Sequence, residues 1–206
     1  MQNHYFYDWE ERWIKNFARN HGVSESLIKL VILIEDKRFL RHKGIDWIAL
    51  VRALLRNLRV FKIKQGASTI SQQLFDMLFL KNFNSLSRIK RKLLKFVGAF
   101  FLERRFDKEE ILKRYLSSVY FGKSYFGIKE AAQGYFSCSP NDLDLPQSFF
   151  LAERIATPNK AKEKRIIKIL RRREIRDLFS NEEFKKLCNI YKKHFLIDLS
   201  EKLGGE

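Results

Sequence analysis

The sequence is poor in glycine, proline and cysteine. Its 206 residues include nine Gly, three Pro and two Cys. So few Gly and Pro exclude a collagen-like or linker-rich protein, and a hydrophobic content of 45% excludes a disordered one. Abundant Leu, Lys, Arg and Glu favour helices over strands joined by turns. We therefore expect an all-α fold with few or no strands.

Cysteine and histidine are too few and too scattered to indicate a structural metal. Cys138 and Cys188 form no CxxC pair, and the four His show no HExxH spacing. We therefore expect no metal site and no certain cofactor. A divalent cation such as Mg²⁺ stays open as an auxiliary.

Long apolar runs are also missing. The longest, such as FVGAFFL at 96–102, fall far short of the roughly 18 residues that span a membrane. The N-terminus, MQNHYFYDWEERW, has no basic start followed by an apolar stretch, so it does not resemble a signal peptide. If the chain is full length we expect it to act on the cytoplasmic side, and if an anchor has been removed we expect it to act on the outer side.

Acidic residues are in short supply. The chain has 24 Asp and Glu against 41 Lys and Arg, a net charge of +17. This excess implies an anionic partner: nucleic acid, anionic lipid or a phosphorylated substrate. The aromatic residues lie at core spacing and do not interleave with the basic run, so no nucleic acid is expected. The segment 46–61 alternates apolar and Arg positions and is basic and amphipathic.

Helical periodicity runs through most of the chain. It predicts helices at about 1–22, 27–34, 46–61, 69–80, 88–105, 108–121, 128–136 and 145–155, with a turn at 64–68. Asp107 is expected to cap the sixth of these helices. Residues 160–206 contain fourteen Lys and Arg with eight acids, which is typical of a charged helical tail.

Glu35 ends the apolar run LVILI at 30–34. If the helix continues, Glu35, Phe39 and His42 share one face. A carboxylate at the edge of an apolar surface suits a general base or acid, because desolvation raises its pKa. From spacing alone, a structural pairing of Glu35 with Lys or Arg is the more frequent arrangement.

Two further segments carry polar or basic side chains at helical spacing. In GASTISQQL, Ser68, Gln72 and Asp76 are expected to share a helix face, as are Thr69 and Gln73. Such rows suit sugar hydroxyls or phosphate oxygens at a helix N-terminus, although Ser68 or Thr69 would equally serve as a plain cap. The run RIKRKLLK at 88–95 suits a diphosphate, nucleic acid, lipid headgroups or simply solvent.

Taken in order, five segments resemble the peptidoglycan glycosyltransferases, glycosyltransferase family 51. They are EDKRFLRHKGID, GASTISQQL, the Arg-Lys pair at 91–92, KEEILKRYLSSVYFG and AAQGYF. The resemblance covers about 23–158 and implies a lysozyme-like, mostly helical fold with a small membrane-facing jaw at about 46–65. It leaves an N-terminal amphipathic helix at 1–22 and a basic helical tail at 159–206.

The resemblance also implies an activity. The family is membrane-associated and joins undecaprenyl-diphosphate-linked disaccharides (lipid II) with inversion. Glu35 would be the general base. The matching substrate-binding positions would be Asp36, Phe39, His42, Ser68, Thr69, Gln72, Gln73, Asp76, Arg91, Lys92 and Lys95. The implied partners are the lipid-linked glycan and an anionic membrane surface, which the basic amphipathic segment suits.

Several positions depart from the family pattern. Asp76 stands where the family usually has Lys, and Lys95 where it has a second functional Glu. If the two face each other, the pair keeps its attraction with reversed polarity, and Lys95 supplies a cation to the phosphates. The departures leave open a relative that uses another polyprenyl-linked glycan for surface polysaccharide assembly, or a non-catalytic glycan-binding protein. A lysozyme-like hydrolase is less favoured, because such enzymes commonly use two carboxylates.

Overall fold

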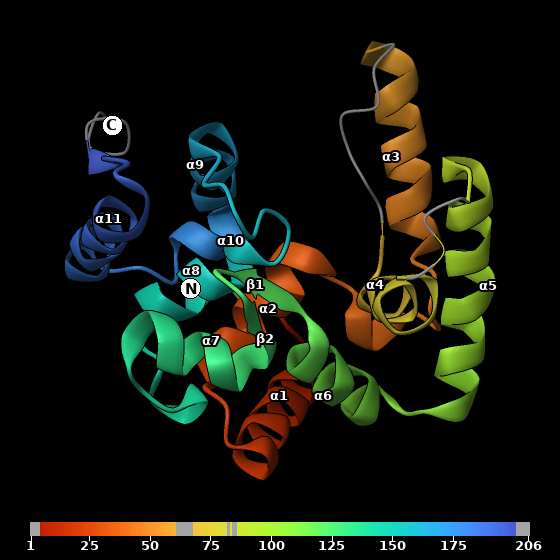
Figure 1. Ribbon diagram of the computed structural model, residues 1–206, viewed down its shortest axis with the longest axis horizontal. Helices are drawn as coiled ribbons and strands as arrows, with labels where there is room; N and C mark the ends of the chain where they lie inside the picture. Colours follow the sequence, from red (N-terminus) through yellow and green to blue (C-terminus); the bar gives the residue numbers. More distant parts are fainter. Residues whose placement is uncertain (1–4, 61–67, 82, 84–85, 201–206) are drawn as a thin grey trace. The chain divides into compact units, whose positions relative to one another are not determined.

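The computed structural model describes residues 5–60, 68–81, 83 and 86–200. The chain forms two compact units, shown with the whole chain in Figure 1. The terminal unit comprises Met1–Ile34 and Val119–Glu206, and the inserted unit comprises Glu35–Ser118. Most of the predicted turn at 64–68, and the end of the predicted jaw at 46–65, lie outside the described residues.

The terminal unit is built almost entirely of helices. Its elements are α1 (Asp8–His21), α2 (Glu25–Glu35, whose last residue belongs to the inserted unit), β1 (Tyr120–Gly122), β2 (Tyr125–Phe126), α7 (Gly127–Phe136), η3 (Pro140–Asp142), α8 (Leu145–Arg154), α9 (Glu163–Leu170), α10 (Arg173–Arg176) and α11 (Asn181–Phe195). β1 and β2 pair antiparallel. Asp144 begins α8 through a capping box with Gln147, which satisfies two backbone N–H groups at that end.

The core of the terminal unit includes the tail. α8 packs against α11, and Phe149 and Phe150 of α8 are fully buried. On α11, Leu187 and Tyr191 are fully buried as well. The Tyr191 hydroxyl donates a hydrogen bond to the buried carboxylate of Glu153, 3.2 Å away. The expected boundary between the domain at 23–158 and the tail at 159–206 does not separate the two compact units. In the structure, α11 of the tail shares a core with α8.

The inserted unit contains η1 (Phe39–Arg41), α3 (Trp47–Val60), α4 (Ile70–Phe75), the π-helix η2 (Asp76–Leu80), α5 (Arg88–Arg105) and α6 (Lys108–Ser118). α4 packs against both α5 and α6. The contact with α5 is close at Gly98, where an added Cβ would lie 2.3 Å from ring atoms of Phe75. Only glycine therefore lets this ring lie on the α5 backbone.

The mostly helical class is confirmed. The helix at 88–105 is confirmed, as is the Asp107 cap, whose carboxylate accepts the Glu110 N–H at 2.8 Å. Several expectations were wrong in detail. The helix expected at 1–22 begins at Asp8, and the helix expected at 108–121 ends at Ser118, before β1. α2 ends at Glu35, so Glu35, Phe39 and His42 do not share one helix. The helix expected at 69–80 changes from α to π at Asp76. Among the helices described, none has the length and apolar character needed to cross a bilayer.

Candidate active site

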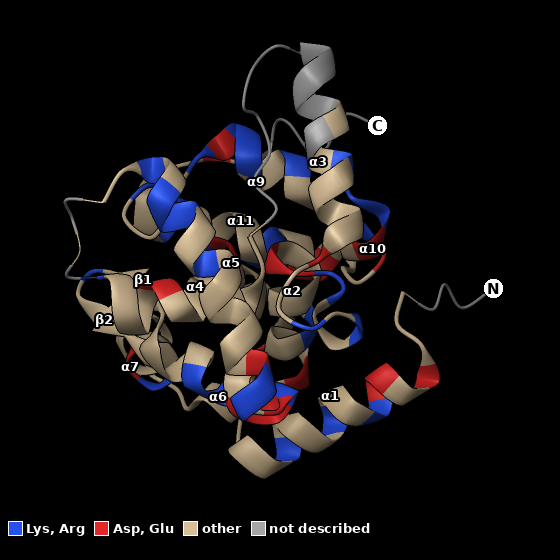
Figure 2. Cartoon of the chain, turned by 90° about the vertical axis from the view of Figure 1, so that its right-hand side faces the viewer, with Lys and Arg blue, Asp and Glu red and all other residues tan. Residues whose placement is uncertain are grey.

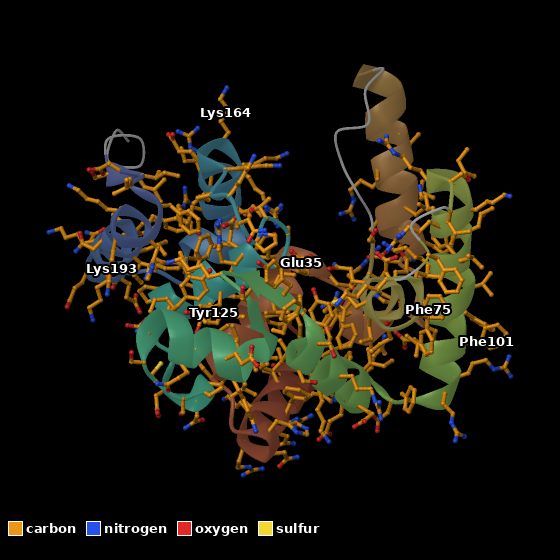
Figure 3. The ribbon with its side chains drawn as sticks, in the orientation of Figure 1. Glu35, Phe75, Phe101, Tyr125, Lys164 and Lys193 are labelled. Carbon is orange, nitrogen blue, oxygen red and sulfur yellow. The ribbon has the colours of Figure 1, made fainter. Side chains whose placement is uncertain are left out.

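Glu35 lies at the C-terminal end of α2, where Figure 3 labels it. The Gln73 side chain on α4 donates a hydrogen bond from Nε2 to Glu35 Oε2, at 2.9 Å. The Tyr115 hydroxyl on α6 donates to Gln73 Oε1, at 3.0 Å. In this arrangement the amide presents its N–H to Glu35 and its oxygen to Tyr115, so the Glu35 carboxylate acts as an acceptor.

Tyr115 is fully buried between apolar neighbours on α6. Burial raises its pKa well above the usual value, and the nearby charges of Glu35 and Asp36 raise it further. The hydroxyl therefore remains neutral and remains a donor across the physiological pH range.

Asp36 is buried immediately after Glu35. Its carboxylate accepts the backbone N–H of Ile70 at 3.0 Å and contacts His42 Nε2 at 2.9 Å. His42 Nδ1 is buried without a hydrogen-bond partner among the described residues. Asp36 thus links the segment that follows α2 to the first turn of α4. This link places the Gln73 side chain close to Glu35.

Phe39 is fully buried, and the Lys108 ammonium lies 4.5 Å from the centre of its ring. Lys108 also contacts Glu103, with Nζ 2.6 Å from Oε1. The same Glu103 oxygen accepts the Ser71 hydroxyl at 2.5 Å. Burial lowers the pKa of Lys108, and the Glu103 carboxylate opposes this shift. These contacts fix α4, α5 and α6 around Phe39.

Thr69 acts as the N-cap of α4. Its hydroxyl oxygen accepts the Gln72 N–H at 3.2 Å and donates to the Gly44 carbonyl at 2.7 Å. Gly44 has a φ of +86°, and an added Cβ would lie 2.8 Å from the carbonyl oxygen of Ala99, so this position requires glycine. The expected row of Ser68, Gln72 and Asp76 is wrong at Ser68, which is exposed and precedes the helix.

Gln72 is 3% exposed, and its Nε2 has no hydrogen-bond partner in the described part of the chain. The Gln72 side chain is therefore buried, whereas the Gln73 side chain contacts Glu35.

Asp76 forms an ion cluster with two cations of α5. Arg91 donates from Nε to Asp76 Oδ1 at 2.7 Å, and Lys95 Nζ lies 3.4 Å from Oδ2. Arg91 and Lys95 are four residues apart, so they lie on one face of α5. Lys92 is exposed, with its ammonium 5.9 Å from the Phe96 ring centre. Figure 2 shows the Lys and Arg residues along α5 in blue.

The structure brings the residues expected from sequence together in separate groups. Gln73 contacts Glu35, His42 contacts Asp36, and Asp76 contacts Arg91 and Lys95. Sequence reasoning missed Tyr115, Ser71, Glu103 and Lys108. A signal was available for the first: Tyr115 places a hydroxyl on the apolar stripe of α6 formed by Ile111, Leu112 and Leu116. No group of three or more His, Cys, Asp or Glu with metal-binding geometry occurs in the described residues.

Residues 3–178 match the family model described as Transglycosylase. "Penicillin-binding protein 4" of Bacillus subtilis is 34% identical over 168 residues, which are 77% of this chain and 26% of that protein. "Penicillin-binding protein 1A" of Aquifex aeolicus is 40% identical over 139 residues, 67% of this chain and 19% of that protein. "Biosynthetic peptidoglycan transglycosylase" of Acinetobacter baumannii is 35% identical over 158 residues, 77% of this chain and 69% of that protein.

The chain spans about a quarter or less of the length of the two penicillin-binding proteins, but about two thirds of the Acinetobacter protein. The resemblance found in the sequence motifs is confirmed by these matches. Because the family model accounts for most of its length, this chain belongs to the transglycosylase family.

Proposed function

We propose that this chain is an inverting glycosyltransferase that joins undecaprenyl-diphosphate-linked sugars into a glycan strand, with lipid II as its substrate. The hydrogen-bonded series from Tyr115 through Gln73 to Glu35 carries this proposal. It fixes one carboxylate in the acceptor form that a general base needs. The printed name of the Acinetobacter baumannii relative, a biosynthetic peptidoglycan transglycosylase, supports the same reaction.

In the proposed reaction, Glu35 takes the proton from the 4-hydroxyl of the acceptor sugar. The hydroxyl oxygen forms a bond to the anomeric carbon of the donor from the face opposite the diphosphate. The bond between that carbon and the diphosphate oxygen breaks, and its electron pair leaves with undecaprenyl diphosphate. Gln73 is a positioning residue, because it holds the Glu35 carboxylate in one orientation.

Asp36 and His42 support this arrangement from the buried side. Asp36 binds the first N–H of α4, so it sets the distance between Gln73 and Glu35. Phe39, being fully buried, shapes the site through packing. Ser68 is exposed at the start of α4, where its hydroxyl is available to a substrate sugar or phosphate.

The cations of α5 are suited to the leaving diphosphate. The single negative charge of Asp76 is paired with the two positive charges of Arg91 and Lys95, so the cluster keeps a net positive charge. Arg91 is held through Nε, which leaves its terminal nitrogens to form a fork toward phosphate oxygens. Lys92 adds an exposed cation on the same helix. Such fixed charges stabilise the negative charge that develops on the departing diphosphate.

The inserted unit also carries apolar surface suited to a membrane. On α3, Trp47, Ile48, Val51 and Leu55 are more than half exposed. On α5, Ile89, Leu93 and Val97 are also more than half exposed, beside its Lys and Arg residues. Apolar side chains flanked by cations favour insertion at an anionic membrane surface. We therefore place the chain peripherally on the cell membrane, where its lipid-linked substrate resides.

The test is release of undecaprenyl diphosphate from purified lipid II. Glu35→Gln should lower the rate by about a thousandfold or more, because it removes the general base and leaves a similar shape. Glu25→Gln, at the other end of α2, is the matched control and should retain the wild-type rate. Retention of most activity by a folded Glu35→Gln variant, or no release by a folded wild-type chain, would overturn the proposal.

A further inference from the structure

A second group of cations lies in the terminal unit, on α9 and the turn that follows it. Residues 160–176 contain nine Lys and Arg but only two acids. Arg165, Arg173 and Arg176 each contact a carboxylate within this unit. Arg172 instead donates to the Leu33 carbonyl.

Lys164, Lys168 and Arg171 follow one another at helical spacing of four and three residues, so they lie along one side of α9. The opposite side is buried in the core through Ile166, Ile169 and Leu170. No carboxylate pairs with Lys164, Lys168 or Arg171 among the residues that the structure describes. Figure 3 shows the Lys164 side chain projecting outward from α9.

These three cations line an open pocket of about 400 Å³ together with Ile167 and Arg172. The backbone beneath the pocket is fixed. The Arg171 N–H donates to the Ile167 carbonyl at 2.9 Å, and Arg172 Nη1 donates to the Leu33 carbonyl of α2 at 3.4 Å. A pocket on a fixed backbone loses less entropy when it binds a ligand than one on a mobile loop.

We propose that this α9 pocket binds the phosphate group of a phosphodiester or diphosphate. Cations that share one small pocket repel each other, and a bound anion removes that repulsion. Arg171 offers a planar fork that matches phosphate oxygens, and the two lysines act as point charges. Ile167 gives the esterified carbon an apolar contact. The pocket shares no residue with the Glu35 site, so this inference goes beyond the proposed function.

The experiment compares two triple variants of the full chain that remove the same charge. The pocket variant is Lys164→Gln/Lys168→Gln/Arg171→Gln. The control variant is Lys185→Gln/Lys186→Gln/Lys193→Gln, from exposed positions of α11. Pyrophosphate binding is measured by calorimetry, and the amide chemical shifts of 164–172 are followed by NMR. If the pocket variant does not fold, Lys164→Gln alone replaces it.

The pocket variant should bind pyrophosphate about tenfold more weakly than wild type, as expected when charge-assisted hydrogen bonds are lost, and the control should change less than about twofold. In wild type, the amide shifts of 164–172 should move with pyrophosphate. Equal losses in both variants would show a net-charge effect and overturn the proposal. Unmoved amides in this segment would overturn it too.

A second arm identifies the source of the phosphate. Sedimentation is measured with phosphatidylglycerol vesicles and with phosphatidylcholine vesicles. A larger loss of phosphatidylglycerol binding in the pocket variant than in the control assigns the site to a lipid headgroup. Equal vesicle binding, combined with lost pyrophosphate binding, assigns it to a soluble phosphate ester. Either result supports a phosphate site, and neither depends on catalytic activity.

Discussion

The Asp76 carboxylate lies 3.4 Å from the Lys95 ammonium, measured from Oδ2 to Nζ. The family resemblance implies a cation at the first position and an anion at the second, so we expect the two charges to be exchanged in this chain. The structure shows that the Asp76 and Lys95 charges face each other. Arg91 joins the pair through its Nε, so that one carboxylate holds two cations of α5 in place.

This relationship makes a charge-reversal series informative. Asp76→Lys would place three cations together, and Lys95→Glu would place two carboxylates together, so each single variant should lose activity about tenfold or more. The double variant restores an opposite pair and should recover part of this loss. The coupling between the two substitutions, calculated from their free energies of unfolding, should be small, about 0.5–1 kcal/mol, because the groups are partly solvated.

The series is read by lipid II turnover and by thermal unfolding. A double variant no better than either single variant would show that the exchanged pair does not act as a unit. In that case the idea that the site was refitted around Lys95 would fail.

Tyr115→Phe tests the outer end of the hydrogen-bonded series. Without the hydroxyl, Gln73 Oε1 loses its donor and the amide is free to rotate away from Glu35. We expect the free energy of unfolding to fall by about 1–3 kcal/mol and kcat to fall about tenfold, with KM little changed. Tyr120→Phe is the control, since its hydroxyl contacts the exposed Asn159 at 3.0 Å. An increase in KM with an unchanged kcat would argue against a positioning role for this hydroxyl.

Membrane binding should depend on both charge and apolar surface. Binding of the chain to phosphatidylglycerol vesicles should weaken as salt rises from low to physiological levels, because ions screen the cations. Trp47→Ala should weaken binding at every salt concentration, since this side chain is 64% exposed on α3. Trp9→Ala on α1 is the matched control. Vesicle binding that does not change with salt concentration would mean that apolar insertion alone drives association.

His194 should make the stability of the terminal unit depend on pH. Burial lowers its pKa, and the charges of Lys123 and Lys193 lower it further. The unfolded chain therefore takes up this proton more readily, so stability falls as pH drops below about 6.5 and levels off below the folded pKa. The loss should be a fraction of a kcal/mol, because the ring is partly solvated.

The check is chemical unfolding near neutral pH and in mild acid. His194→Phe keeps the ring contacts with Tyr135 and Phe150 but removes the titration. This variant should lose less stability in acid than the wild type does. An identical acid loss in both proteins would assign the effect to other groups.

The sequence by itself determined the helices and the identity of the family. Helix 88–105, its Asp107 boundary and the order of the motifs were readable because helix periodicity and capping involve residues only a few positions apart. Glu35 was indicated by the family resemblance, because from spacing alone a structural pairing with Lys or Arg is the more frequent arrangement.

Only the tertiary structure decided how these residues work together. Gln73 meets Glu35 across 38 positions of sequence, and Tyr115 meets Gln73 across 42. The facing of Asp76 and Lys95, and the inclusion of α11 in the core of the terminal unit, depend in the same way on how helices pack. Such pairings are set by the complementary surfaces of whole helices, which a local pattern of residues does not encode.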